Sequence, residues 1–274
     1  MKYLKFLSES TNYTQIRLSF GHFCNQKCVY CYNKFNYGKK FLEKSDIDLF
    51  FKKIHESNLK NVFIHLLGGE PTVNPNLRYF EERCDKDDSI KEVRVYSNLK
   101  KHIDFFSDKF TLNPSFHHKA NFDHFLKELI YHRKRIKRIS LMDFAQRDRI
   151  QRLLEILKDY PDLLEVSEIC PVFFKEYQGV SYEHPDTNKE FEYFDGEKKL
   201  LISHKDIVDN KMSFKGWRCD TNTYDIGCDL GVQTACFNLG NLHDKDFRFK
   251  TFDFYCTKER CSELYKLQIY KELE

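Results

Sequence analysis

Two kinds of apolar segment alternate between residues 14 and 173, and this alternation constrains the fold more than any other feature of the sequence. Short runs typical of strands occupy residues 14–20, 61–67, 92–97, 110–115, 138–144 and 165–174. Helical periods lie between them, and one helix is expected to begin at a capping box of Ser45 and Asp48. Strands that alternate with helices form right-handed βαβ units. The sequence therefore predicts an α/β fold, a partial (β/α)6 barrel with its helices outside.

Two motifs follow the first two predicted strands. Cys24, Cys28 and Cys31 come after the first strand, and the turn Gly68–Gly69–Glu70–Pro71 ends the second. The carboxyl ends of parallel strands meet at one edge of a sheet, where such folds place their functional groups. We therefore expect the cysteine loop and the glycine turn to be neighbours.

The loop of Cys24, Cys28 and Cys31 supplies three thiolates within eight residues of sequence. Thiolates are the ligands of iron–sulfur clusters, and three of them on a four-iron cube leave one iron open to a small molecule. A structural zinc site is the alternative, but it requires four ligands, and no fourth Cys or His lies close by in the sequence.

The composition excludes several classes of protein. The chain has 274 residues, a formal net charge of +3 and ten cysteines. No apolar run has the length of a signal peptide core or of the roughly 18 residues that span a bilayer. We expect a cytoplasmic protein whose cysteines bind metal rather than form disulfides. The charges are interspersed, so the composition does not favour nucleic-acid binding.

The segment from Cys24 to Cys31, with Tyr30 directly before the third cysteine, resembles the signature loop of the radical S-adenosylmethionine (SAM) superfamily. The resemblance extends over about residues 14–173 and implies a [4Fe-4S] cluster that binds SAM and cleaves it reductively. The product is a 5′-deoxyadenosyl radical that abstracts a hydrogen atom from the substrate. The resemblance also implies an electron donor such as flavodoxin or ferredoxin.

The resemblance assigns SAM contacts to particular residues. Gly68, Gly69, Glu70 and Pro71 match the turn that holds the SAM amino group, and Tyr30 is expected near the adenine. Ser97 and Asn98 resemble a polar pair that contacts the ribose or carboxylate, and Ser115 resembles a similar contact. The glycine-rich motif that some members carry after the fifth strand is absent at residues 140–145.

The second group of cysteines lies in residues 215–274, which are separated from the barrel (residues 1–174) by a polar connector (residues 175–214). A β-hairpin is expected around Gly231. The spacing from Cys219 to Cys236 resembles the opening of a twitch or SPASM extension in its short form, which implies one auxiliary [4Fe-4S] cluster. The expected ligands are Cys219, Cys236, Cys256 and Cys261. A structural zinc is the alternative, and Cys228 is expected to pack inside the hairpin.

Several residues near strand ends are weaker candidates for catalysis. His117, His118, Asp143 and Cys170 are candidates to accept or donate a proton or hydrogen atom, and Cys228 is a second candidate thiol donor. Each of them is more often an ordinary core or surface residue. Cys84 lies in a charged helical stretch and is expected to be inert.

The leading functional prediction is a maturase that acts on a peptide or peptide-like natural product, for example by crosslinking or epimerisation. The alternative is a dehydrogenase of a sugar or aminocyclitol. An activase of glycyl-radical enzymes shares the cysteine loop, but the additional C-terminal cysteines argue against it. A metal-binding module without catalysis is the alternative from a different class.

Overall fold

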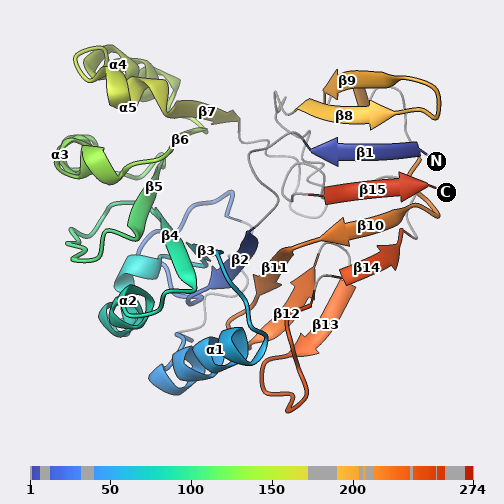
Figure 1. The fold of residues 1–274 in the computed structure, drawn as a ribbon. Coiled ribbons are helices and arrows are strands. Elements are labelled where there is room, and N and C mark those ends of the chain that lie inside the picture. The colour runs from blue at the N-terminus through green and yellow to red at the C-terminus, as the bar shows by residue number, and fades with distance from the viewer. Residues whose placement is uncertain are drawn as a thin grey trace.

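The computed structural model describes residues 2–6, 13–31, 40–171, 190–203, 206–207, 213–234, 237–250, 252–256 and 269–273. Their strands form two sheets, one of nine strands and one of six (Figure 1). Cys236 and Cys261 lie outside the described residues, so the prediction that they bind metal is not tested by their placement.

Six parallel strands form most of the larger sheet, in the order β2-β3-β4-β5-β6-β7. They are β2 (Thr14–Ser19), β3 (Val62–Leu67), β4 (Ile90–Ser97), β5 (Phe110–Phe116), β6 (Ile139–Asp143) and β7 (Ser167–Pro171). Each overlaps a strand expected from the sequence, which confirms the α/β fold and the partial barrel.

The helices lie on the outer side of this parallel sheet (Figure 1). They are α1 (Lys44–Glu56), α2 (Leu77–Asp85), α3 (Phe122–His132), α4 (Arg147–Leu157) and α5 (Pro161–Glu165), with 3-10 turns η2 (Pro71–Val73) and η3 (Arg133–Arg135). The predicted capping box of Ser45 and Asp48 was wrong. The helix begins one residue earlier than Ser45, and Glu43 and Asp46 form the reciprocal cap.

Three strands from the C-terminal part of the chain extend the parallel sheet beyond β2. They are β11 (Thr223–Ile226), β12 (Gly231–Thr234) and β13 (Phe237–Asn241). β11 and β12 are antiparallel, with Ile226 opposite Val232, which confirms the predicted hairpin. β11 also pairs in parallel with β2, so the extension and the barrel share one sheet.

The six-stranded sheet joins segments from both ends of the chain, in the order β14-β10-β15-β1-β8-β9. Its strands are β1 (Lys2–Phe6), β8 (Glu190–Phe194), β9 (Lys199–Ser203), β10 (Arg218–Thr221), β14 (Phe252–Tyr255) and β15 (Ile269–Leu273). β1 and β15 lie side by side (Figure 1). Pairing thus crosses the expected boundaries at 174 and 214, and the expected connector includes a hairpin, β8–β9.

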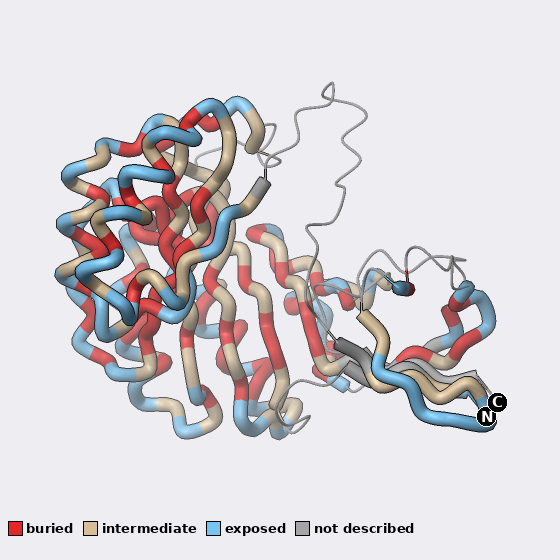
Figure 2. The backbone as a smooth tube through the Cα atoms, turned by 90° about the horizontal axis from the view of Figure 1, so that it is seen from above, coloured by how far each residue is buried: buried red, intermediate tan, exposed pale blue. Residues whose placement is uncertain are grey.

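A continuous apolar core lies between the parallel sheet and its helices, and Figure 2 shows buried positions along these strands. Ile16, Leu18 and Ile64 point into it and are fully buried. Their strand neighbours Arg17 and His65 point to the opposite, inner face because side chains alternate along a strand. In the described part of the chain, no helix has the length and apolarity needed to cross a membrane.

Candidate functional site

The loop that carries Cys24, Cys28 and Cys31 follows β2 directly. Cys28 is buried, while Cys24 and Cys31 are half-buried. A turn in which the Cys31 amide donates to the Cys28 carbonyl (3.1 Å) brings the last two cysteines together. The pKa of Cys28 is raised to about 11, chiefly by burial; a hydrogen bond with Tyr30 opposes this shift, and the charges of Cys24 and Cys31 contribute to it. A bound metal ion would displace the protons of these thiols.

The glycines of the turn after β3 are required by the cysteine loop itself. Gly68 has φ +123°, and a Cβ atom there would lie 2.3 Å from the carbonyl oxygen of Gly21. A Cβ atom on Gly69 would lie 2.2 Å from the carbonyl oxygen of Phe23. The amides of Gly69 and Glu70 donate to these two carbonyls at 2.8 and 2.9 Å. The two motifs are thus neighbours, as predicted, and the turn supports the loop through backbone contact.

Glu70 connects the ends of β3 and β4. Its buried carboxylate accepts hydrogen bonds from the Thr72 amide and hydroxyl, from the Ser97 hydroxyl (2.8 Å) and from the Asn98 amide (2.7 Å). Burial raises the pKa of Glu70, and these donors oppose the shift. Both carboxylate oxygens already accept hydrogen bonds within the protein. Through these hydrogen bonds, Glu70 holds Thr72, Ser97 and Asn98 in position.

Asn98 carries this connection on to the cysteine loop. Its side-chain nitrogen donates to Asn25 Oδ1 at 2.8 Å and lies 3.9 Å from Cys24 Sγ. The next residue but one, Lys100, donates from Nζ to the Asn25 carbonyl at 2.9 Å. Sequence reasoning did not identify Asn25, although its position inside the three-cysteine loop was a signal. The ends of β2, β3 and β4 thus form one hydrogen-bonded unit.

Tyr30 lies in an aromatic group with His117, His118 and Phe144. Its hydroxyl is 2.7 Å from His117 Nδ1, and its ring centroid is 4.9 Å from that of Phe144. Burial lowers the pKa of His117 to about 4, with His118 adding to the shift, so His117 is neutral at physiological pH. The group joins the cysteine loop to the ends of β5 and β6.

A row of polar side chains crosses the inner face of the parallel sheet. Strand register aligns Asp225, Arg17, His65, Arg94 and Thr111 on five neighbouring strands. Arg17 and Asp225 form an ion pair of 3.1 Å. Burial lowers the pKa of His65 to about 3, and the two arginines add to the shift. We call these five residues the inner polar row.

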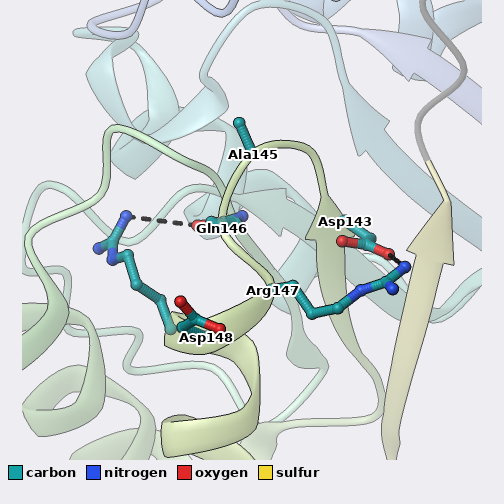
Figure 3. Close-up of a pocket in the computed structure, with 6 residues that line it drawn as sticks. Asp143, Ala145, Gln146, Arg147 and Asp148 are labelled. Atoms are coloured by element: carbon teal, nitrogen blue, oxygen red, sulfur yellow. Dashed lines mark hydrogen bonds and ion pairs between the residues drawn. The ribbon is translucent and has the colours of Figure 1, made fainter.

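An open hollow lies at the carboxyl end of β6 (Figure 3). Asp143 pairs with Arg147 at 3.0 Å, and Gln146 accepts a hydrogen bond from Arg149 at 3.3 Å. The Gln146 amide nitrogen donates to the carbonyls of Phe116 (3.0 Å) and Met142 (2.6 Å). Where the glycine-rich motif is absent, Gln146 thus fixes the loop after β6 to the end of β5. Asp143 is held in an ion pair, and its predicted catalytic role remains a prediction.

Cys219 and Cys256 are both buried and lie on neighbouring strand segments of the six-stranded sheet. Cys219 pairs with Phe254, and the Cys256 amide donates to the Trp217 carbonyl at 2.7 Å. This register places the two cysteines diagonally on the same face, a spacing of about 7–8 Å between Cα atoms. A shared metal site is compatible with that spacing.

Cys228 lies elsewhere, at the other sheet. Its sulfur is 3.2 Å from the Ser19 hydroxyl and 3.3 Å from the Ser19 carbonyl, at the end of β2. It is buried, as expected for a packed thiol, but against the first barrel strand.

The remaining candidates are spread over the barrel. Cys170 on β7 is half-buried and contacts the Glu168 carbonyl at 3.8 Å. Ser115, near the carboxyl end of β5, pairs with Ser140, the second residue of β6. Cys84 is fully buried in the apolar core, which agrees with the expectation that it is inert.

The donor set fits the cofactors that the sequence suggested. Three thiols come from one loop, which suits a four-iron cluster with one open iron. Two buried polar atoms near the loop and on the inner face, Gln26 Nε2 and Asn113 Oδ1, have no hydrogen-bond partner among the described residues. Such atoms are expected where a ligand completes a site.

Comparison with known proteins agrees with this fit. The family model of the radical SAM superfamily matches residues 18–167, more than half of the chain. No match was found among curated proteins. Among solved structures, polyhistidine-tagged anSMEcpe with bound AdoMet has a TM-score of 0.53 at 12% identity and covers 84% of this chain and 78% of its own.

Two further solved structures are similar. Native anSMEcpe with AdoMet and the Cp18Cys peptide has a TM-score of 0.53 at 13% identity, with 84% of this chain and 77% of that chain covered. SuiB of Streptococcus suis bound to S-adenosylmethionine has a TM-score of 0.42 at 12% identity, with 86% and 64% covered. The anSMEcpe matches show a common fold. By its family model, the chain belongs to the radical SAM superfamily, whose members are enzymes that use a [4Fe-4S] cluster and SAM.

Proposed function

We propose that this chain cleaves SAM reductively and abstracts a hydrogen atom from a peptide or peptide-like substrate. The observation that carries the proposal is the hydrogen-bonded unit at the strand ends, in which Asn98 joins Cys24 to Glu70. It fixes three potential iron ligands beside a glycine turn at the edge of the sheet where α/β folds bind ligands.

Each side chain has a defined part in this proposal. Cys24, Cys28 and Cys31 hold the cluster, and the Gly68–Pro71 turn with Ser97, Asn98 and Ser115 binds SAM. Tyr30 packs near the adenine, where its contacts with His117 and Phe144 hold the ring in place. When bound, the cluster and SAM supply the radical that removes a hydrogen atom. The chain itself positions the reactants and excludes water from them.

The inner polar row favours a substrate that is polar. Arg17 and Asp225 are 22% and 36% exposed, so both groups are accessible from the inner face. Charged and imidazole groups there are suited to the amides of a peptide. The same groups are suited to the hydroxyl and amino groups of an aminocyclitol, which makes a dehydrogenase of such a compound the second candidate.

An auxiliary [4Fe-4S] cluster in the C-terminal region is the second part of the proposal. The diagonal placement of Cys219 and Cys256 supports it, and Cys236 and Cys261 are the proposed further ligands. The cluster would take up an electron from the substrate or bind the substrate directly.

The test is anaerobic reconstitution followed by reduction in the presence of SAM. We expect about eight irons per chain and formation of 5′-deoxyadenosine. Replacing Cys24, Cys28 and Cys31 together with Ala should abolish 5′-deoxyadenosine and leave about four irons. A Cys84→Ala variant is the matched control, because this thiol lies in the apolar core. About four irons with one zinc in the wild type would reject the auxiliary cluster.

A panel of peptides and aminocyclitols then separates the two candidate functions. Product from peptides alone supports the maturase, whereas product from aminocyclitols alone supports the dehydrogenase. An absence of 5′-deoxyadenosine under all conditions would contradict both.

A further inference from the structure

A second group of potential metal ligands lies on the outer side of the barrel and includes none of the described cysteines. His102 belongs to the segment that leads from β4 to β5, and Glu128 and His132 lie one turn apart on α3. One ligand atom from each of the three residues lies within 4.8 Å of the other two. Among the described residues, no other group of His, Cys, Asp or Glu meets this condition.

The geometry of the three side chains converges on one carboxylate oxygen. Glu128 Oε2 is 2.7 Å from His102 Nδ1 and 3.5 Å from His132 Nε2. Ligand atoms around a tetrahedral zinc ion, each about 2.0–2.2 Å from the metal, are separated by roughly 3.3 Å. Small movements of the exposed His102 ring are therefore enough to admit an ion.

His132 provides an independent sign of a missing partner. The residue is 5% exposed, and its Nε2 atom has no hydrogen-bond partner among the described residues. This nitrogen lies 3.5 Å from Glu128 Oε2, close enough for an ion pair when the imidazole is protonated, but it forms no hydrogen bond there. A buried imidazole nitrogen without a hydrogen bond is costly, and a metal ion would satisfy it.

The surroundings also match those of a metal-binding histidine. His102 Nε2 is 3.3 Å from Asp104 Oδ2, so the ring nitrogen away from Glu128 faces a carboxylate. The Tyr131 hydroxyl donates to the other oxygen of Asp104 at 2.8 Å. Metal-ligating histidines commonly donate their second nitrogen to a carboxylate, which fixes the ring and its tautomer.

We propose that His102 Nδ1, Glu128 Oε2 and His132 Nε2 bind a divalent transition-metal ion of the zinc type, with water completing the coordination. Two imidazoles and one carboxylate form a ligand set that suits Zn²⁺. The ion would connect α3 to the segment after β4. That segment begins with Asn98 and Lys100, which contact the cysteine loop. The ion would therefore stabilise, from the outer side of the barrel, a segment that holds the loop in place.

The test uses the anaerobically reconstituted protein, in which iron occupies the cysteine sites, and titrates it with Zn²⁺. We expect one zinc per chain beyond the cluster iron. His102→Ala, at an exposed position, and Glu128→Gln, of equal size, should each weaken zinc binding by about tenfold or more. His243→Ala, at an exposed turn, should bind zinc like the wild type. Equal affinity in all four proteins would overturn the proposal.

X-ray absorption at the zinc edge identifies the ligands directly. Only nitrogen and oxygen neighbours at about 2.0–2.2 Å are expected, with the scattering pattern of imidazole. Sulfur in the zinc shell would place the metal at cysteines and overturn the proposal. Bound zinc should also raise the melting temperature of the wild type by about 2 °C or more and leave that of His102→Ala unchanged.

Discussion

The nine-stranded sheet and the six-stranded sheet differ in what their side chains offer for stability. Helices cover one face of the first, and fully buried residues such as Leu18, Ile64 and Phe80 form a continuous core there. Around the second, Phe214, Trp217, Cys219 and Cys256 are buried but do not join that core. Metal ligation is a general source of stability for segments that fold together with their metal. We infer that the first sheet folds on its own packing, and we propose that the auxiliary cluster, once bound, stabilises the second.

The largest expected effect comes from replacing Cys219 and Cys256 together with Ala. Because the proposed auxiliary cluster loses two ligands, iron should fall from about eight to about four per chain. Product formation should stop, whereas part of the SAM cleavage should remain. Hydrogen exchange should rise in β10 and β14 and stay slow in β3 and β4. An unchanged iron content, or equal hydrogen exchange in both sheets, would contradict the proposal that the cluster stabilises the six-stranded sheet.

Gly68→Ala and Gly216→Ala form a matched pair, one near each sheet. Both glycines have positive φ, but only at Gly68 does a Cβ atom collide with backbone, 2.3 Å from the Gly21 oxygen. We expect Gly68→Ala to cost about 3 kcal/mol or more of unfolding free energy and to lower cluster content. Gly216→Ala should cost about 1–2 kcal/mol, since only its φ is strained. Equal losses of unfolding free energy in denaturant titrations would show that the backbone around Gly68 moves to accept a Cβ atom at little energetic cost.

Glu70→Gln tests the connection between strand ends at nearly constant size. A carboxamide supplies one acceptor oxygen and a donor group, and it faces donors from Thr72, Ser97 and Asn98. At least one buried donor is then unsatisfied, at a cost of about 1–3 kcal/mol. We expect about tenfold weaker SAM binding, equal to about 1.4 kcal/mol, with the iron content retained. SAM affinity equal to that of the wild type in equilibrium binding would contradict this role.

The smallest effect concerns pH and His65 in the first sheet. Burial holds its pKa at about 3, far below the 6.5 of an exposed histidine. The unfolded chain therefore binds a proton below pH 6.5 that the folded chain does not, and stability falls as pH decreases. Between pH 6.5 and 5.5 this amounts to about 1 kcal/mol. His65→Gln should show a smaller decrease in denaturant titrations over this interval, and an identical decrease would exclude His65 as its source.

Much of the first sheet was predictable because its signals are local. The alternation of strand and helix gave all six parallel strands, and the residues around Gly231 gave the hairpin β11–β12. The pairing of Lys2 with Leu273, and of Thr223 with Gln15, depends on contacts between distant segments that leave no periodic signal. The irregular composition of residues 175–214 likewise concealed the β8–β9 hairpin.

The candidate site likewise has features that the local sequence predicted and features that only the structure revealed. The motif spacing placed the cysteine loop beside the glycine turn, but the reason for the glycines, contact with Gly21 and Phe23, appeared only in the structure. The sequence analysis identified none of His102, Glu128 and His132, although Glu128 and His132 are four residues apart on a helix. No pattern links His102 to α3.

The pairing of β1 with β15 has a consequence for synthesis. Strand β1 can pair with β8 once residues 190–194 have emerged from the exit tunnel, but it is joined to β10 only after residues 269–273 have emerged. The parallel strands β2 to β7 have complete helices and neighbours well before that moment, and domains generally fold as they emerge. Residues 2–6 therefore gain both of their strand neighbours only after the parallel strands of the barrel have been made. The six-stranded sheet is therefore completed after the barrel.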